Sequence, residues 1–350
     1  MKLTRVFAFM AMAGLATSAL ATNGYFSHGY GIKAKGMGGA ATASTDDAFF
    51  GANNPAAAAF AGNRLDLGVD LFSPNREASR TGLGPLDMSV ESDSNYFFVP
   101  EFGYNRMINN DLALGLTVYG NGGMNSDYPG GQIDCGGGPA NMLCGSGDLG
   151  VDLMQLIIAP TVAFKFSPNH SIGVSPLIGL QFFEANGLQA FGGISSDPTA
   201  LTNNGHDDAW GFGVRVGYLG KITPTVTIGA AYASKMSMDE FDDYAGLFAE
   251  QGDFDIPENY NLGVSWQATP QLRLAMDYQR INYSDVNSVA NASLVPFPLG
   301  ADNGPGFGWS DVDVWKLGIE YKHNQAWTYR AGYNHGDNPI SSSDVTFNIL

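Results

Sequence analysis

Apolar and polar residues alternate along eleven short segments of this chain. In the segment 65–71 every second residue is leucine or valine, and in the segment 210–218 every second residue is aromatic or valine. A two-residue period sends successive side chains to opposite faces of a β-strand. We therefore expect strands, with ends uncertain by about 2 to 4 residues, at 64–75, 95–105, 112–120, 152–166, 172–184, 208–219, 226–235, 256–267, 272–284, 312–322 and 327–335.

The connections between these segments are long and short by turns. Gaps such as 121–151 and 285–311 are long, whereas 167–171 and 220–225 hold only a few residues. A transmembrane β-barrel has this rhythm, because its tight turns lie on one side of the membrane and its long loops on the other. The pattern predicts an all-β, antiparallel transmembrane barrel.

The amino end is typical of an exported protein. Lys2 and Arg5 precede the mostly apolar run 6–16, and Ala19-Leu20-Ala21 resembles a cleavage site, so residues 1–21 are expected to be a signal peptide. No later run has the about 20 apolar residues that a spanning helix needs. Aromatic residues gather near the segment ends, where rings favour the lipid headgroup region. We expect the protein in the bacterial outer membrane.

Charge and cysteine content limit the chemistry. The formal net charge of −17 makes nucleic acid an improbable partner. The carboxylates of 239–255 do not have the spacing of an EF-hand calcium site, and we expect no metal and no cofactor. Cys135 and Cys144 lie close together in one long gap, which in an exported chain favours a disulfide; a metal pair is the alternative, with no further ligand nearby.

The last predicted strand, 327–335, runs outward if the first begins in the periplasm. A closed bacterial barrel has an even number of strands and both termini in the periplasm. The sequence therefore predicts a barrel, 64–350, that is incomplete at its carboxyl end.

Residues 22–63 differ from the rest, being rich in alanine and glycine and without alternation. We expect them to fold inside the barrel as a plug. Their sequence, from Asn23 to Phe60, contains GYG, KGMGGA and NNPA in that order and resembles the start of the FadL/TodX family. GVDLMQL at 150–156 and YQRINYSDV at 278–286 agree with that family as well.

The resemblance implies a 14-stranded barrel, of which about 11 strands are present here, with an amino-terminal hatch. It also implies passive uptake of long-chain fatty acids or other hydrophobic compounds by a monomer in contact with outer-membrane lipid. A ligand would pass from a groove among the outer loops to a lumen pocket and leave sideways at a kink in the third strand. Because each buried methylene gains roughly 0.8 kcal/mol, an apolar path suits such a ligand better than a watery pore.

Particular residues follow from the resemblance. Asn54, Pro55 and Ala56 match the element that lies against the strand-three kink, and Gly120, Asn121 and Gly122 match the kink itself. Tyr25 and Phe26 match the end of the hatch that reaches the pocket. The residues expected to border the outer groove are Met142, Leu143, Leu149 and Leu153.

Alternation points several charges into the lumen, namely Lys165, Arg215, Arg273, Lys316, Arg330, Asp277 and Glu320. Most lumen charges are expected to pair with one another. A carboxylate ligand would need unpaired cations, and Arg215 and Lys316 are the candidates.

Three other functions would each need different features. A general diffusion porin would need an open polar channel and no plug, and an adhesin or structural barrel would act through its loops. An enzyme is not expected, because neither GxSxG nor a complete P-loop occurs. His28 could act as a base in an outer-membrane phospholipase, but no serine is placed with it on one lumen strand.

Overall fold

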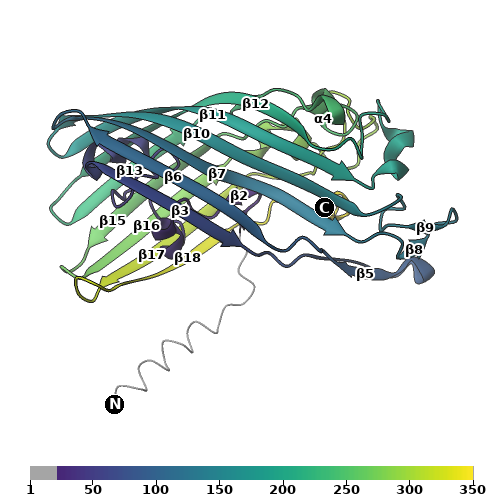
Figure 1. Ribbon diagram of the computed structural model, residues 1–350, viewed down its shortest axis with the longest axis horizontal. Helices are drawn as coiled ribbons and strands as arrows, with labels where there is room; N and C mark the ends of the chain where they lie inside the picture. The colour runs from purple at the N-terminus through teal and green to yellow at the C-terminus, as the bar shows by residue number, and fades with distance from the viewer. Residues whose placement is uncertain (1–21, 350) are drawn as a thin grey trace, which may run out of the picture.

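The computed structural model describes residues 22–349, so the expected signal peptide lies outside the described residues. Eleven long antiparallel strands form one curved sheet that makes a nearly closed barrel (Figure 1). They are β3 (Arg64–Phe72), β6 (Phe97–Met107), β7 (Leu112–Tyr128), β10 (Leu149–Ser167), β11 (His170–Asn186), β12 (Asp207–Lys221), β13 (Val226–Ala233), β15 (Asn259–Gln267), β16 (Leu272–Ile281), β17 (Val312–Lys322) and β18 (Thr328–Gly336).

Each long strand pairs with the next one along the chain, as expected where tight turns join them. β3 and β18 are the two ends of this order, and no pairing joins them within residues 22–349. The sheet also includes the short strands β1 (Thr22–Asn23), β2 (Phe26–Ser27) and β14 (Ser237–Met238).

The remaining elements are short. Residues 22–63, called the N-terminal segment from here on, contain α2 (Ile32–Gly36), η1 (Pro55–Ala57) and α3 (Ala58–Ala61). The loops contain β4 (Glu77–Arg80), η2 (Gly84–Leu86), β5 (Met88–Glu91), β8 (Ile133–Asp134), β9 (Pro139–Ala140), η3 (Gln189–Ile194), η4 (Asp242–Tyr244), α4 (Ala249–Gly252), η5 (Tyr283–Asp285), α5 (Asn287–Ala290) and η6 (Val345–Asn348). None of the described helices has the length and apolar character to cross a bilayer.

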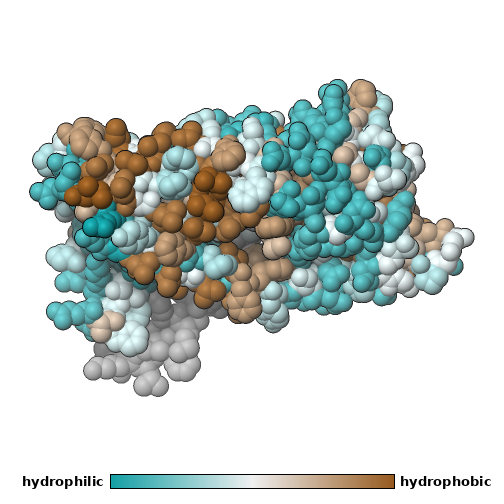
Figure 2. Space-filling model, turned by 45° about the horizontal axis from the view of Figure 1, so that its top comes forward, coloured by the Kyte–Doolittle hydropathy of each residue, from teal (hydrophilic) through white to brown (hydrophobic). Residues whose placement is uncertain are grey.

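The alternation predicted from sequence separates the two faces of the wall. Leu67 and Phe212 point outward and are 72% and 68% exposed, whereas Arg215 is 3% exposed on the inner face. Figure 2 shows the outer apolar residues as a brown band over one half of the wall, with a hydrophilic surface at the other end. A band of this kind is what the hydrocarbon region of a bilayer requires.

The N-terminal segment packs on the inner faces of the strands. A Cβ at Gly217 of β12 would lie 2.1 Å from Asn54 Oδ1, and one at Gly173 of β11 would lie 2.4 Å from the carbonyl carbon of Pro55. These inner positions therefore have no room for a side chain. The close approach explains why glycine alternates with large residues along the wall.

Candidate functional site

The pairing between β6 and β7 stops part of the way along the wall. It runs from Met107 opposite Ala113 to Phe102 opposite Val118, whereas β7 stays paired with β10 as far as Tyr128. The chain returns to β7 near its outer end, where the Asp93 N–H donates to Asp127 O at 2.8 Å. Between these points, one edge of β7 has no long strand beside it. We call this interval the β6–β7 opening.

A β-bulge lies on β7 at this opening. Gly122 is opposite Gln155 and Gly120 is opposite Leu156, so Asn121 is an extra residue on β7. Bulges bend a strand and interrupt its ladder. The sequence predicts that strand three ends at these glycines, and that prediction is wrong: the strand continues to Tyr128, because β10 pairs with it along its whole length.

The N-terminal segment occupies the free edge of β7. Phe26 pairs with Gly122, and the Gly123 N–H donates to Tyr25 O at 3.1 Å. The side chains of Tyr25 and Phe26 are only 1% and 2% exposed. The opening is therefore closed in this structure by residues from the amino end of the chain.

A chain of side-chain hydrogen bonds crosses the bulge. Tyr30 Oη contacts Asn121 O at 3.0 Å and Asn121 Oδ1 at 3.1 Å. Asn121 Nδ2 then donates to Gln155 Oε1 at 2.8 Å. These bonds connect the N-terminal segment to β7, and β7 to β10, at the point where β7 is no longer paired with β6. We call these three residues the bulge relay.

Aromatic rings surround Tyr25 on the side of the outer loops. Its ring centroid lies 5.5 Å from that of Phe26, 5.1 Å from Tyr283 and 5.9 Å from both Phe254 and Trp309. The packing continues through further rings from the loops and β11. This aromatic cluster consists of Tyr25, Phe26, Phe183, Phe241, Tyr244, Phe248, Phe254, Tyr283, Phe307 and Trp309.

A polar cavity borders Phe26 on its other side. Arg215 and Lys316 line it together with Asn259, Asn261 and Gln279, and the two cations are only 3% and 5% exposed. The free space is small, with room for about one water molecule. A larger ligand group could enter only if a neighbouring side chain moved.

Neither cation of this cavity makes a direct ion pair with a carboxylate among residues 22–349. Arg215 donates to Gly51 O at 3.4 Å, and Lys316 feels the charge of Asp277 without a direct contact. Asp277 stands opposite Lys316 in the register of β16 and β17, but its carboxylate turns to the N-terminal segment and accepts the Ala41 and Thr42 N–H groups, each at 2.8 Å. Unpaired buried cations are costly, and their retention is a signal for an anion site.

Three of the other lumen charges, Arg273, Glu320 and Arg330, pair as expected. Arg330 contacts Glu320 at 2.7 Å, and Arg273 contacts Glu320 at 3.2 Å and also Asp46. Lys165 lies over the Phe60 ring, 4.8 Å from its centroid. The predicted inward direction of these residues is confirmed.

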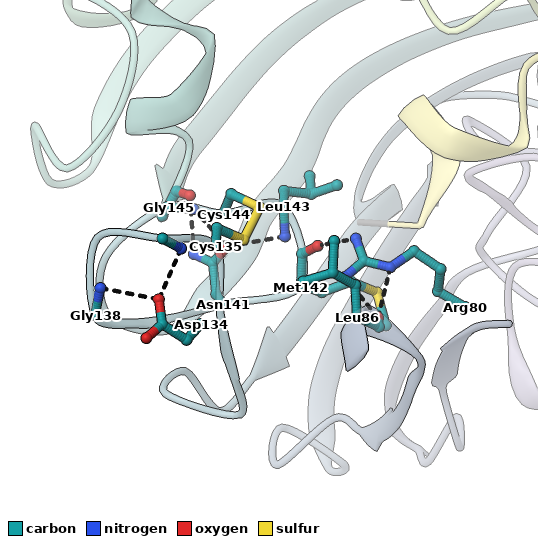
Figure 3. Close-up of a disulfide and its surroundings, with 12 residues drawn as sticks. Arg80, Leu86, Asp134, Cys135, Gly138, Asn141, Met142, Leu143, Cys144 and Gly145 are labelled. Atoms are coloured by element: carbon teal, nitrogen blue, oxygen red, sulfur yellow. Dashed lines mark hydrogen bonds between the residues drawn. A yellow bond between two sulfur atoms is a disulfide. The ribbon is translucent and has the colours of Figure 1, made fainter. Parts of the chain in front are cut away.

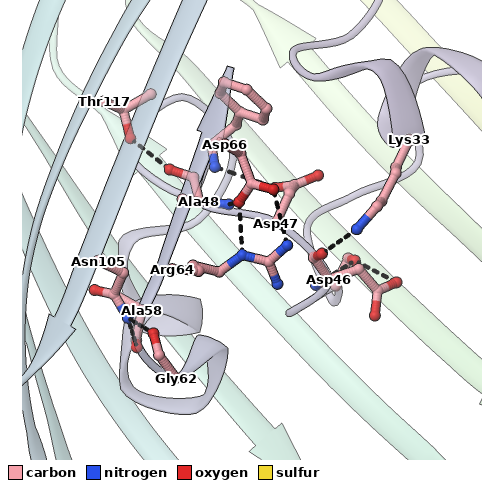
Figure 4. Close-up of polar contacts among 12 residues, drawn as sticks. Lys33, Asp46, Asp47, Ala48, Ala58, Gly62, Arg64, Asp66, Asn105 and Thr117 are labelled. Carbon is pink, nitrogen blue, oxygen red and sulfur yellow. Dashed lines mark hydrogen bonds and ion pairs between the residues drawn. The ribbon is translucent and has the colours of Figure 1, made fainter. Parts of the chain in front are cut away.

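Polar contacts hold the N-terminal segment against the wall (Figure 4). Asp66 of β3 accepts the Ala48 N–H at 2.9 Å, and Thr117 of β7 donates to Ala48 O at 3.0 Å. Asn105 of β6 donates to Ala58 O and Gly62 O, both at 2.8 Å. Because these hydrogen bonds reach three different strands, the whole segment can leave the wall only if many of them break together.

The NPA element lies elsewhere than expected. The resemblance places Asn54, Pro55 and Ala56 against the kink of the third strand, and the structure contradicts this. Asn54 Nδ2 donates to Tyr218 O of β12 at 2.9 Å, and Ser171 of β11 donates to Ala56 O at 2.8 Å. The Asn54 side chain also accepts the Ala56 N–H and so caps η1.

The residues expected along an outer groove are mostly internal. Met142, Leu149 and Leu153 are 3%, 0% and 2% exposed and belong to the apolar core that includes Tyr25; Leu143 packs against it, partly buried. Their participation in ligand capture stays a prediction. The expected Cys135–Cys144 disulfide is confirmed. It closes the loop shown in Figure 3, where Arg80 donates to Met142 O at 2.6 Å.

Sequence reasoning missed Tyr30, Gln155, Tyr283 and Trp309, which complete the surroundings of Tyr25. Tyr30, Gln155 and Tyr283 lie in the GYG, GVDLMQL and YQRINYSDV stretches that carry the family resemblance, which was the available signal, whereas no motif marks Trp309. Among residues 22–349, no three or more histidine, cysteine or acidic side chains gather closely enough to hold a metal ion.

Comparison with known proteins agrees with this architecture. Residues 10–349 match the family model described as outer membrane protein transport protein (OMPP1/FadL/TodX). The Pseudomonas putida toluene transporter TodX is 21% identical, with a TM-score of 0.65 over 91% of this chain and 86% of that one. The Ralstonia pickettii toluene transporter TbuX is 20% identical, with a TM-score of 0.63 over 89% and 87%.

A Pseudomonas aeruginosa FadL homologue is 18% identical, with a TM-score of 0.64 over 91% of this chain and 82% of that one. A search of curated proteins found no significant match. The structural likenesses establish the fold, and the family model covers nearly the whole chain. This protein therefore belongs to the FadL/TodX family of bacterial outer-membrane proteins that transport hydrophobic compounds.

Proposed function

We propose that this protein takes up long-chain fatty acids, or hydrophobic compounds with a similar acidic head group, and releases them sideways into the outer membrane through the β6–β7 opening. Uptake is passive. The observation that carries the proposal is the free edge of β7, from Tyr119 to Ser126, which is covered by Tyr25 and Phe26 rather than by a long strand.

A lateral route suits both the ligand and the lumen. The N-terminal segment fills the axis as a plug and is bonded to β3, β6, β7 and β16, whereas only a two-residue strand covers the opening. A hydrocarbon tail that leaves through the wall passes from apolar protein into apolar lipid and never returns to water, which would cost roughly 0.8 kcal/mol per methylene.

The cavity beside Phe26 supports an acidic head group. Arg215 and Lys316 are buried there without carboxylate partners, and a ligand carboxylate would supply the missing charge. Phe26 lines the cavity and its backbone pairs with Gly122, so a ligand that enters by displacing the whole residue would also uncover the free edge of β7. Ligand binding and opening of the wall are thereby coupled.

The lateral route is tested by locking the opening. Gly120 and Val99 face each other across it, since a Cβ at Gly120 would lie 2.7 Å from Val99 Cγ1. We expect the double variant Val99→Cys, Gly120→Cys to fold and to form a second disulfide. Uptake of radiolabelled palmitate by cells should then fall at least tenfold and should recover on reduction.

The control is a cysteine pair at the register partners Val162 and Val174, which point outward in the β10–β11 ladder, treated with the same reductant. This pair should leave uptake unchanged. Full uptake by an oxidised β6–β7 variant would rule out the lateral route.

The head-group site is tested by Arg215→Met and Lys316→Met. Each should weaken palmitate binding about tenfold or more, as expected for a lost charged hydrogen bond of roughly 1.5–3 kcal/mol, and should leave binding of an uncharged hydrocarbon unchanged. The matched control is Arg330→Met, because Glu320 then keeps Arg273 as its partner. Equal palmitate affinity in all three variants would refute the site.

A further inference from the structure

We propose that Asn259 and Gln279 recognise a hydroxyl group next to the acidic head of the ligand, so that the cavity beside Phe26 prefers 2-hydroxy fatty acids to unsubstituted ones. This inference rests on the proposed uptake function and deepens it, because it assigns a substrate class to the site of Arg215 and Lys316.

Two amide oxygens at this cavity are buried without partners. Asn259 and Gln279 both line it, and they are only 3% and 5% exposed. Neither Asn259 Oδ1 nor Gln279 Oε1 has a hydrogen-bond partner within residues 22–349. Nearly all buried polar groups in proteins are paired, so two exceptions at one cavity indicate a ligand that donates a proton to them.

The register of the wall places each amide near one of the two cations. Asn259 and Arg215 share Ala233 as their register partner, one on each side of it. Gln279 lies two residues along β16 from the register partner of Lys316, and residues two apart on a strand share a face. A head group that reaches the cations therefore also reaches the amide oxygens.

A carboxylate alone cannot complete this cavity. It has only acceptors, so the two amide oxygens would face it without a proton between them. The Tyr30 hydroxyl, which also lines the cavity, is already engaged with Asn121. Arg215 Nε is a further buried atom without a partner in the described part of the chain. A hydroxyl group can accept from such an N–H and donate to an amide oxygen at the same time.

The size of the cavity fixes where the hydroxyl must be. The free space has room for about one water molecule, and a hydroxyl group is of that size. The carboxylate needs the additional space that a displaced Phe26 leaves. Only a hydroxyl on the carbon next to the carboxylate can stay within the same small cavity, and this makes the favoured ligand a 2-hydroxy acid.

Three probes with the same chain test this directly. 2-Hydroxypalmitate and 2-methylpalmitate have nearly the same shape, but only the first carries a proton donor, and palmitate is the unsubstituted reference. Each competes with radiolabelled palmitate for the full-length folded protein in detergent at pH 8, where all three are ionised. We expect the wild-type protein to prefer the hydroxy acid to the methyl acid about three- to tenfold, as one neutral hydrogen bond gives.

The double variant Asn259→Leu, Gln279→Met should lose this preference without changing the affinity for 2-methylpalmitate, and the single variants show which oxygen takes the proton. Gln279→Met should unfold at no lower temperature than the wild type, since it removes an unpaired buried oxygen. The matched control is Gln181→Met. Gln181 is buried, and its Oε1 also has no partner among residues 22–349, but it does not line this cavity, so the preference should stay.

Equal binding of the hydroxy and methyl acids by the wild type would mean that water or the cations satisfy the two oxygens, and would overturn the hydroxyl site. If Arg215→Met still weakened palmitate binding, the proposed head-group site would remain. A preference that persists in the double variant, or that falls equally in Gln181→Met, would also overturn the inference. A preference lost only in the cavity variants, with uptake unaffected by the locked opening, would uphold it and remove the lateral route.

Discussion

Asn121 does three things at one position. Its backbone is the extra residue of the bulge, its carbonyl oxygen and Oδ1 both contact Tyr30, and its amide nitrogen holds Gln155. It is 1% exposed, so each of these polar groups depends on a protein partner. The bulge would otherwise place unpaired groups in an apolar wall, where they cost several kcal/mol each.

Tyr30→Phe tests the importance of this contact. The change leaves Asn121 Oδ1 buried without its donor, which should cost about 1–3 kcal/mol and loosen the N-terminal segment at β7. Hydrogen exchange of the Gly123 amide, which donates to Tyr25 O, should become faster.

Tyr119→Phe is the control for that experiment. Its ring packs on Tyr30 with centroids 4.8 Å apart, but its hydroxyl has no partner within the described part of the chain. Exchange at Gly123 should stay as in the wild type. Faster exchange in both variants would show that ring packing, not the hydrogen bond, holds the segment.

For single residues, the sequence predicts which face of the wall a side chain points to, but not which residue it contacts. Alternation correctly turns Arg215 and Lys316 inward. It cannot show that Asp277 gives its carboxylate to backbone N–H groups rather than to Lys316. It also cannot connect Tyr30 to Asn121, which is 91 residues away, because that contact exists only after the wall has formed.

Among the elements, β7 is the strand that carries both the bulge and the unpaired edge of the wall. The glycines at 120, 122 and 123 are poor strand formers, which is why the sequence predicts a strand that ends at 120. Pairing with β10 overrides that weak preference. The glycines still matter, since a Cβ at Gly123 would lie 2.3 Å from Leu153 O.

The loop between β13 and β15, residues 234–258, carries a pH dependence. Burial, and then the charge of Asp255, raises the pKa of Asp253 from its ordinary value of 3.8 to about 7. A carboxyl whose pKa is raised on folding binds a proton more tightly in the folded loop. The folded loop is therefore most stable at low pH and loses stability as the pH rises from about 4 to about 7.

Protection factors for hydrogen exchange across residues 241–256, in which the pH dependence of the intrinsic exchange rate is divided out, should accordingly be higher at pH 5 than at pH 8. In Asp253→Asn this difference should largely disappear, because the group no longer titrates. The reference is Asp255→Asn, which leaves Lys235 without its partner and should speed exchange at both pH values. An unchanged pH dependence in Asp253→Asn would assign the effect to another group.

For the whole molecule, the barrel and the N-terminal segment are one packed unit. The composition of residues 22–63 sets them apart from the wall, and the family resemblance places their NPA element at the kink. In the structure Asn54 instead lies against β12 and caps η1, and Tyr25, Phe26 and Tyr30 are the residues at β7. A shared motif identifies a relative, whereas the position of a short element depends on the packing of every strand around it.

Gly217→Leu should displace the N-terminal segment from the barrel without preventing the strands from forming. The new side chain would occupy the place of Asn54, so the segment should leave the lumen while the strands still form. We expect trypsin to cleave at Lys33 or Lys35 and porin-like conductance to appear in planar bilayers. The neighbouring outward change Val216→Leu is the control and should conduct as little as the wild type. A conductive wild-type protein would instead support the porin alternative.

The inner glycines also constrain how the N-terminal segment is seated. Gly229 and Gly332 lie so close to the backbone of the N-terminal segment, at Thr42 and at Met37 to Gly38, that a side chain at either wall position would meet that backbone. A larger residue at one of these glycines would therefore change the seating of the segment even where the strands around it still pair.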